Sequence, residues 1–240
     1  MTRLLILGGT GEAVTLARAA APALEVTTSL AGVTRDPVLP PGEVHRGGFG
    51  GSDGLAAYLR ARGVHAVIDA THPFAAAMSR NAVAATAQAD VPLLRLTRPA
   101  WTQQTDDIWI EVSDTAAAAK AITAERVFLT TGLRDLDAFA VRRDVWFLVR
   151  SIEPPARVPL AHCELIQARG PFDETAETEL MRDHRIETLI AKNSGGDATY
   201  AKIAAARALG LPVIMIARPV LPAVETVNDV AAALAWARAL

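Results

Sequence analysis

The chain begins with four consecutive aliphatic residues, Leu4 to Leu7, which pass directly into the glycine-rich turn Gly8-Gly9-Thr10-Gly11. An unbroken apolar run of this kind predicts a parallel strand that is covered on both faces. The alanine-rich segment that follows, Ala13 to Ala20, predicts a helix. Bare glycine backbone and the unpaired N–H groups of a helix N-terminus together attract an anion. We therefore expect a phosphate-binding turn, the alternative being a tight turn that needs glycine only for its backbone angles.

The spacing of this turn departs from the usual G-x-G-x-x-G dinucleotide pattern. Gly9 and Gly11 fit the first two glycine positions, but Val14 stands where the third glycine belongs. The motif therefore supports phosphate binding mainly through its position, at the start of a chain that continues as strand and helix.

The end of the second predicted strand, Leu24 to Ser29, indicates which dinucleotide would bind. NAD sites commonly place Asp or Glu there, about 20 residues after the glycines, to accept from the ribose hydroxyl. This chain has Thr27-Thr28-Ser29 instead, and Arg35 follows. A hydroxyl and a guanidinium suit a 2′-phosphate, so we expect NADP(H), bound through Ser29 and Arg35. The alternative for Arg35 is an exposed loop charge.

Predicted strands and helices alternate along the whole chain, which is typical of α/β proteins with parallel sheets covered on both faces. The passage from Ala66 resembles the passage from Thr188, since each reads as strand, polar loop, alanine-rich helix and a strand closing in Arg-Pro. The passage from Val127 likewise echoes the passage from Leu4. The alternative is that any two βαβ units look alike.

This duplication predicts two Rossmann-like parallel-sheet domains with a ligand cleft between them. We expect residues 1–104 to form a dinucleotide-binding domain and residues 105–240 to form a substrate domain. Whether the closing segment returns to the first domain is left open. Helices are also predicted at 53–62, with Ser52 as N-cap, and at 198–209.

Composition excludes several classes of function. The net charge of −2 gives no reason to expect a nucleic-acid or membrane partner. No apolar run reaches the roughly 18 residues of a membrane helix, and no charged-then-apolar leader precedes the first strand. The single cysteine, Cys163, permits neither an intramolecular disulfide nor a thiolate metal cluster. We expect a cytoplasmic protein without a metal site.

Polar residues follow several of the predicted strands. Thr71, His72 and Pro73 follow one strand, and His72 would either exchange protons with a ligand or bond to loop backbone. In the second half, Thr131 and the segment Lys192 to Gly196 occupy equivalent strand ends. A lysine beside a Gly-Gly turn suits a carboxylate or a phosphate, the alternative being a solvated Lys192 with Ser194 as a helix N-cap.

Arginines also gather at strand ends, and as a group they would suit a polycarboxylate. Taken singly, each of them reads as a surface charge. They are Arg95, Arg98, Arg134, Arg150, Arg169 and Arg218.

Four segments together resemble the precorrin-6A reductase family of cobalamin biosynthesis. They occur in the family's order and spacing over nearly the whole chain, and the DATHPFA stretch is the most specific of them. They are Leu7 to Ala13, Asp69 to Ala75, Arg95 to Pro99 with Trp101, and Lys192 to Gly196.

The resemblance implies a reductase that transfers a hydride from NADPH to the precorrin-6A macrocycle and yields its dihydro form. It also implies two Rossmann-like domains with the cofactor between them. The aerobic branch of the family uses a metal-free substrate and NADPH, while an anaerobic relative uses a cobalt-containing substrate. The missing carboxylate near Ser29 favours the NADPH branch.

The resemblance further assigns roles to residues. Gly9, Thr10, Gly11, Glu12 and Ala13 would hold the pyrophosphate, and Thr71, His72 and Pro73 would lie on the nicotinamide side. The tetrapyrrole's carboxylates would be bound by Arg95, Arg98, Thr131, Lys192, Asn193, Ser194 and Arg218. Because the nicotinamide carries the hydride, the protein supplies mainly position and a proton. His72 is the candidate proton donor or orienting group, and solvent or the substrate is the alternative source.

Other classes of protein remain as alternatives. A non-catalytic NADP(H) sensor would have little use for a cationic second half, and a phosphosugar-processing enzyme would not bind NADPH tightly. The Tyr-x-x-x-Lys pair of short-chain dehydrogenases is absent, since Arg62 follows Tyr58 and Ala204 follows Tyr200 at that spacing. A G-x-S-x-G nucleophile turn is also absent.

Overall fold

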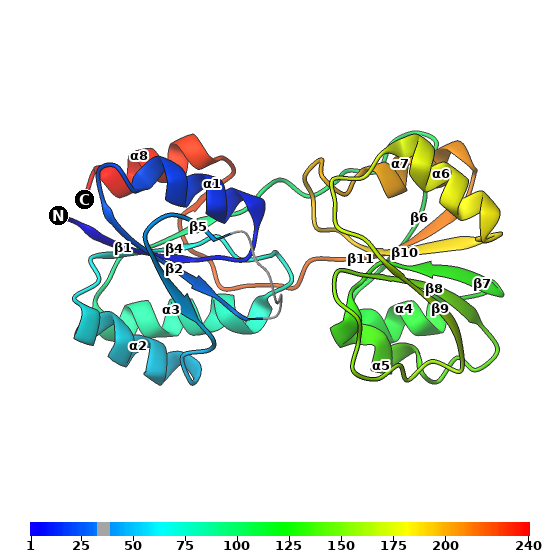
Figure 1. Cartoon of the computed structure of the whole chain (residues 1–240), viewed down its shortest axis with the longest axis horizontal. Helices are drawn as coiled ribbons and strands as arrows, with labels where there is room; N and C mark the ends of the chain where they lie inside the picture. Colours follow the sequence, from blue (N-terminus) through cyan, green and yellow to red (C-terminus); the bar gives the residue numbers. More distant parts are fainter. Residues whose placement is uncertain (33–38) are drawn as a thin grey trace. The chain divides into compact units, whose positions relative to one another are not determined.

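The computed structural model describes residues 1–32 and 39–240, so that Arg35 lies outside the described residues. The chain divides into two compact units, which are described separately. Unit 1 comprises Met1–Pro99 and Pro219–Leu240, and unit 2 comprises Ala100–Arg218. Each unit is built on a six-stranded parallel sheet with helices on both of its faces (Figure 1). The predicted fold class, two parallel-sheet α/β domains, is confirmed.

Unit 1 contains the glycine-rich turn, and both ends of the chain belong to it. Its sheet has the order β12-β5-β4-β1-β2-β3. Its strands are β1 (Arg3–Leu7), β2 (Glu25–Leu30), β3 (Glu43–Arg46), β4 (Ala66–Asp69), β5 (Leu93–Leu96) and β12 (Thr226–Val227). Its helices are α1 (Gly11–Ala20), α2 (Gly51–Arg62), α3 (Ala76–Ala89) and α8 (Val230–Arg238).

Unit 2 repeats this architecture with the sheet order β6-β11-β10-β7-β8-β9. Its strands are β6 (Ile108–Val112), β7 (Arg126–Leu129), β8 (Trp146–Ser151), β9 (His162–Gln167), β10 (Thr188–Lys192) and β11 (Pro212–Ile216). Its helices are α4 (Thr115–Ala121), the short 3₁₀ turn η1 (Leu133–Asp135), α5 (Leu136–Phe139), α6 (Glu174–Asp183) and α7 (Ala201–Ala208).

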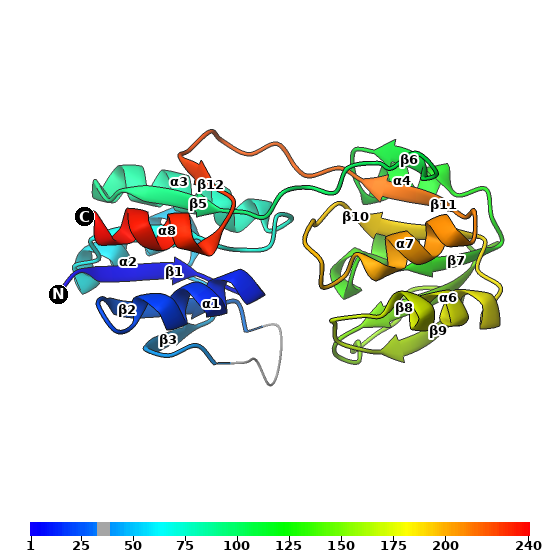
Figure 2. The same ribbon diagram turned by 90° about the horizontal axis from the view of Figure 1, so that it is seen from above.

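The two halves of the chain exchange their sixth strands. Strand β6 follows β5 along the chain but pairs with β11 in unit 2, and β12 follows β11 but pairs with β5 in unit 1 (Figure 2). Each exchanged strand leads into a helix of its new unit, α4 or α8. The first crossing between the units falls at Pro99–Ala100 rather than at residue 104, and residues 219–240, whose return was left open, belong to unit 1.

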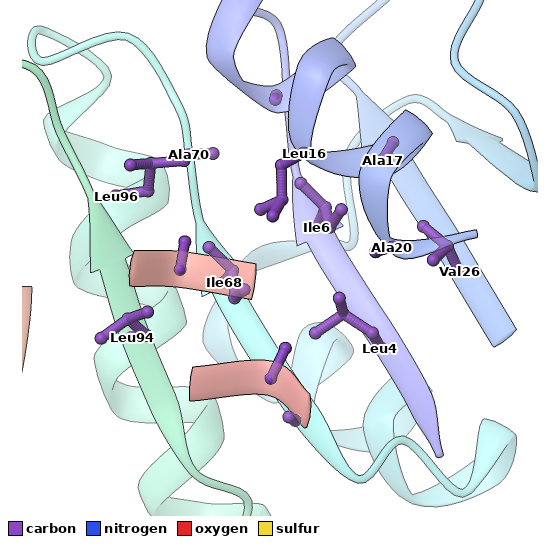
Figure 3. Packing of buried hydrophobic residues seen from close by; sticks show 14 of the residues in the cluster. Leu4, Ile6, Leu16, Ala17, Ala20, Val26, Ile68, Ala70, Leu94 and Leu96 are labelled. Atoms are coloured by element: carbon purple, nitrogen blue, oxygen red, sulfur yellow. The ribbon is translucent and has the colours of Figure 1, made fainter. Parts of the chain in front are cut away.

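Strand β1 lies at the centre of the unit 1 sheet, and Leu4 to Leu7 are each at most 1% exposed. Successive side chains of a strand point to opposite faces. Leu4 and Ile6 accordingly pack with α1 and α8, where Leu16 of α1 lies against them (Figure 3). Leu5 and Leu7 pack with α2 and α3 on the other face. The aliphatic run is therefore covered on both faces, as predicted.

Four helices follow an N-cap residue whose side chain accepts a backbone N–H of the first turn. Thr10, Asp114, Asp173 and Asp229 cap α1, α4, α6 and α8 in this way. Helix α2 differs, and the prediction of Ser52 as its N-cap is wrong. The chain enters α2 through Gly50, which has a φ of 79° and no side chain, so that Ser52 already lies in the first turn. No helix of residues 1–32 or 39–240 has the length and apolarity needed to cross a membrane.

Candidate functional site in unit 1

The glycine-rich turn leaves β1 at the carboxyl edge of the unit 1 sheet. Gly8 must be glycine, because a Cβ there would lie 2.9 Å from the Thr28 side-chain methyl and 3.2 Å from the Ser29 carbonyl oxygen. Gly9 has a φ of 111°, a conformation that L side chains rarely adopt. Gly11 has no positive φ, and no atom would lie within 4 Å of its Cβ. Packing therefore explains Gly8 and backbone conformation explains Gly9, whereas Gly11 has open space at its Cβ position.

Thr10 ties this turn to the neighbouring strand end. Its Oγ1 accepts the Ala13 N–H at 3.2 Å and donates to the Ala70 carbonyl oxygen at 2.8 Å. The first bond caps α1, and the second joins it to the residue that follows β4. The N-terminus of α1 is thus fixed beside the loop that begins at Thr71.

Glu12 lies in the first turn of α1 and pairs with Arg98, which follows β5. The Arg98 Nη1 donates to both carboxylate oxygens, at 3.1 and 3.0 Å. Burial acts to raise the pKa of Glu12, but the bond from its own backbone N–H and the Arg98 charge outweigh burial and leave that pKa lowered. A carboxylate and its counter-ion therefore occupy the positive end of the helix dipole.

Asp69, the last residue of β4, organises the loop after that strand. Its Oδ1 accepts from the Thr71 N–H at 3.2 Å and from the Thr71 hydroxyl at 2.6 Å. Its Oδ2 lies 3.7 Å from Nε of Arg95, and the Asp69 side chain is 2% exposed. The Arg95 Nη1 in turn donates to the Pro222 carbonyl oxygen at 3.2 Å. Arg95 is therefore a half-buried ion-pair partner of Asp69 and also bonds to the returning segment.

Sequence reasoning gave Asp69 no role of its own. The signal was available, because a carboxylate two residues before a hydroxyl at the end of a buried strand is the pattern of an Asx-type turn.

His72 follows Thr71 and is oriented by its neighbour. Its Nδ1 accepts the Phe74 N–H at 3.2 Å. A nitrogen that accepts holds no proton, so the neutral ring carries its proton on Nε2. The peptide bond between His72 and Pro73 is trans, since the cis bond in the described parts of the chain is Gly170–Pro171.

Several residues of the glycine-rich turn and of the loops after β4 and β5 line one small, open pocket. Its walls come from the residues after β1, β4 and β5, which is the edge where open α/β sheets bind ligands. The lining residues are Thr10, Glu12, Thr71, Pro73, Leu96, Thr97 and Arg98. Five residues that the sequence singled out, namely Thr10, Glu12, Thr71, Pro73 and Arg98, are thus brought together.

Of the two predicted 2′-phosphate residues, Ser29 is described, and it lies one strand away. Ser29 in β2 is the register partner of Leu7 and is 7% exposed. The next position, Leu30, pairs with Arg46 at the end of β3, where the Arg46 residue is exposed. Arg46 was not singled out from the sequence, because nothing there shows that β3 lies beside β2.

The predicted residues of unit 2 also cluster, but the contacts described for them are internal. The Asn193 side chain bonds to both backbone groups of Trp101. Its Oδ1 accepts the Trp101 N–H at 2.8 Å, and its Nδ2 donates to the Trp101 carbonyl oxygen at 3.0 Å. Arg218 donates from Nε to the Asn193 carbonyl at 2.9 Å and from Nη2 to the Ser194 carbonyl at 3.1 Å. Lys192 pairs with Asp135.

The structure also places Ser194 and Thr131 in unit 2. Ser194 is not a helix N-cap, because α7 begins at Ala201 after Tyr200. Thr131 is buried at 7% exposure, and its hydroxyl has no hydrogen-bond partner in the described parts of the chain. Arg95 and Arg98 belong to unit 1 and Arg218 to unit 2, and each bonds to groups of its own unit.

Comparison with known proteins decides the family. A model of the family "Precorrin-6x reductase CbiJ/CobK" matches residues 3–238. The chain belongs to the precorrin-6x reductase family. The precorrin-6A reductase of Rhodococcus erythropolis is 54% identical over 98% of this chain and 97% of its own length. That of Rhodobacter capsulatus is 46% identical over 98% of this chain and 96% of its own length.

A solved structure described as CobK precorrin-6A reductase agrees in fold as well as in sequence. It matches this chain with a TM-score of 0.94 and 46% identity, and the match covers 100% of this chain and 97% of the other. The protein is therefore an oxidoreductase of this family, which uses a nicotinamide cofactor, and the resemblance read from the sequence is confirmed.

Proposed function

We propose that the protein reduces the precorrin-6A macrocycle to its dihydro form in cobalamin biosynthesis, with a hydride from NADPH. The observation that carries the proposal is the pocket of unit 1, in which the glycine-rich turn, Thr71 and Arg98 lie together at the carboxyl edge of the sheet. Bound NADPH would supply the hydride, and this chain would bind and orient the two reactants.

The turn around Gly11 supports a dinucleotide. Neither backbone strain nor packing requires glycine at position 11, and the missing side chain leaves room for a ligand to approach the backbone there. The Ala13 N–H is already bonded to Thr10 and the Glu12 N–H to its own carboxylate, so the pyrophosphate would meet the Gly11 backbone and the positive end of the helix dipole. Arg98 would compensate the charge of Glu12 beside that pyrophosphate.

The end of β2 supports NADPH over NADH. The described residues there, Thr28 to Leu30, include no carboxylate to accept from a ribose hydroxyl. Ser29 and the exposed Arg46 offer a hydroxyl and a guanidinium, which suit a 2′-phosphate. Arg35 is kept as a second candidate for this contact.

The relatives support a metal-free substrate. Curated precorrin-6A reductases are 43% to 54% identical over at least 95% of the chain. Curated cobalt-precorrin-6A reductases are 25% to 29% identical over 68% to 70% of it. The carboxylate arms of the substrate would meet Lys192 and Ser194 of unit 2, with Thr131 at the adjacent strand end.

His72 would orient a reactant through its Nε2–H. Because its Nδ1 accepts the Phe74 N–H, the neutral ring can donate only from Nε2. His72 is therefore kept as the candidate proton donor or orienting group, with solvent or the substrate as the alternative source of the proton.

Absorbance of the reduced nicotinamide, followed with purified protein and precorrin-6A, tests the proposal. We expect NADPH to be oxidised only when the tetrapyrrole is present, and NADH to be used far less well. Tight binding of NADPH without any oxidation would contradict the enzymatic proposal and favour an NADP(H) sensor. A preference for NADH would contradict the assignment of Ser29 and Arg46.

A further inference from the structure

We propose that Asp69 fixes the Thr71 hydroxyl as a hydrogen-bond acceptor towards the pocket, so that Thr71 recognises the amide NH2 of the nicotinamide carboxamide. Asp69 is then a positioning residue, and Thr71 determines which group of the cofactor is accepted. This inference rests on the proposed use of NADPH, and its experiment separates the two.

The Thr71 hydroxyl donates its single hydrogen to Asp69. A hydroxyl has one hydrogen to donate and two lone pairs that accept. The 2.6 Å bond from Oγ1 to Oδ1 of Asp69 uses that hydrogen. An ionised carboxylate can only accept, so the Thr71 hydroxyl is the donor in this bond. What Thr71 offers to the pocket is therefore a pair of acceptor sites.

Contacts at both carboxylate oxygens orient the Asp69 side chain. Oδ1 also accepts the Thr71 N–H at 3.2 Å, which anchors that oxygen to the loop. Oδ2 points towards the guanidinium of Arg95, whose Nε lies 3.7 Å away. Asp69 and Arg95 are register partners on adjacent strands, and their side chains are 2% and 13% exposed. The two hydrogen bonds from Thr71 to Oδ1 and the Arg95 charge beside Oδ2 together orient the carboxylate, although Oδ2 itself accepts no hydrogen bond from the described residues.

Because the Thr71 hydroxyl can only accept, it selects a ligand group that donates. Phosphate oxygens have no hydrogen to offer a second acceptor at neutral pH, and a ribose hydroxyl can turn to suit either polarity. The carboxamide NH2 of nicotinamide can only donate, so it gains most from a wall that can only accept. Thr71 lines the pocket, whereas Asp69 is buried and is not one of the lining residues. The bond would fix the rotation of the carboxamide and, with it, the face of the ring that is presented.

Two ligands that differ only in this donor test the inference. NADP⁺ carries the carboxamide, while its 3-acetylpyridine analogue keeps the carbonyl and replaces NH2 by a methyl group. We would measure the Kd of each by calorimetry. For the native protein we expect NADP⁺ to bind about tenfold more tightly, the effect of leaving a buried acceptor unpaired.

Variants of Thr71 then locate the effect. Thr71→Ser keeps the hydroxyl and should keep the preference, whereas the similarly shaped Thr71→Val should bring the two Kd values to within about twofold of each other. The ratio of two Kd values is insensitive to the fraction of folded protein, so a purely structural loss would leave it unchanged.

Asp69→Asn tests the positioning residue. An asparagine removes the negative charge and sets its NH2 either against the Arg95 guanidinium or against the Thr71 N–H, so it disturbs the contacts that orient the Thr71 hydroxyl. We expect this variant to lose the preference for NADP⁺ although Thr71 is intact. If Asp69→Asn does not fold, Thr71→Val and Thr71→Ser still decide the role of the hydroxyl.

The outcomes are distinguishable. Equal affinity of the native protein for both ligands, or a preference that survives in Thr71→Val, would overturn the inference and leave NADPH use intact. A preference that survives in Asp69→Asn would overturn the role of Asp69. Failure of the native protein to bind either ligand would overturn the proposed cofactor itself, and the inference with it.

Discussion

Arg98 and Glu12 are separated by 86 positions in the chain, yet one guanidinium nitrogen bonds to both carboxylate oxygens, at 3.1 and 3.0 Å. The pair joins the residue after β5 to the first turn of α1. It places a negative charge where the pyrophosphate is proposed to bind, and it places the compensating cation beside that charge.

Removal of Arg98 should therefore weaken NADPH binding. Arg98→Ala leaves the Glu12 carboxylate facing the pyrophosphate without its cation, and we expect the Kd to rise at least about tenfold. Calorimetry measures this directly. The double variant Arg98→Ala/Glu12→Gln should recover part of the loss, and an unchanged Kd in Arg98→Ala would show that the pyrophosphate binds elsewhere.

The same pair gives a dependence of stability on pH. The pKa of Glu12 is lowered in the folded protein from the ordinary value of 4.5. The carboxylate therefore contributes stability above pH 4.5, and this contribution is lost as pH falls through the lower folded pKa. The Tm difference between the native protein and Glu12→Gln should shrink as pH falls below 4.5. A difference that stays constant across this range would contradict the lowered pKa.

Gly11 and Gly9 should respond differently to alanine. Gly11 has no positive φ and open space at its Cβ, so Gly11→Ala should keep the Tm but weaken NADPH binding. Gly9 has a φ of 111°, so Gly9→Ala should lower the stability of the fold by about 1–2 kcal/mol. Thermal unfolding and calorimetry on both variants make the comparison. Native affinity in Gly11→Ala would argue against a phosphate at this turn.

Arg46 should contribute to the choice of NADPH over NADH. Arg46→Ala removes the exposed guanidinium beside Leu30, and we expect the ratio of NADPH to NADH affinity to fall about tenfold. Arg18→Ala removes an exposed arginine from the last turn of α1 and is the matched control. If both variants keep the native ratio, the contact falls to Arg35 or Ser29.

In unit 2, the Arg150–Glu177 pair should be important for folding. Both side chains are at most 7% exposed, and the Arg150 guanidinium lies 3.7 Å from the centre of the Phe172 ring. Glu177→Ala leaves that guanidinium buried and unpaired, which should cost about 3–5 kcal/mol of unfolding free energy. Urea denaturation measures the loss. The apolar double variant Arg150→Met/Glu177→Leu should restore most of it, and a loss below 1 kcal/mol in Glu177→Ala would contradict the pairing.

The sequence predicts those parts of the fold that depend on local chemistry. The apolar run Leu4 to Leu7 predicts a buried parallel strand, because both faces of that strand are covered. Asp114 predicts the start of α4, because its carboxylate caps the helix. Ser52 misled the prediction because glycines, which leave no capping side chain, carry the chain into α2.

The remaining features depend on contacts between distant segments. Strand β12 has two residues and forms only because β5 offers an open edge, so no local pattern marks it or the exchange of sixth strands. The bonds of Asn193 to Trp101 and of Arg98 to Glu12 likewise join segments about 90 positions apart. Residue type identified these side chains as candidates, but only the fold reveals their partners.

The most direct test of the central proposal is the fate of the hydrogen at C4 of the nicotinamide. Precorrin-6A would be reduced with NADPH that carries deuterium on one face of C4 or on the other, and the tetrapyrrole product would be weighed by mass spectrometry. The proposal predicts that one deuterium enters the macrocycle from one of the two labelled cofactors and none from the other. A product whose new hydrogens all come from solvent would contradict direct hydride transfer.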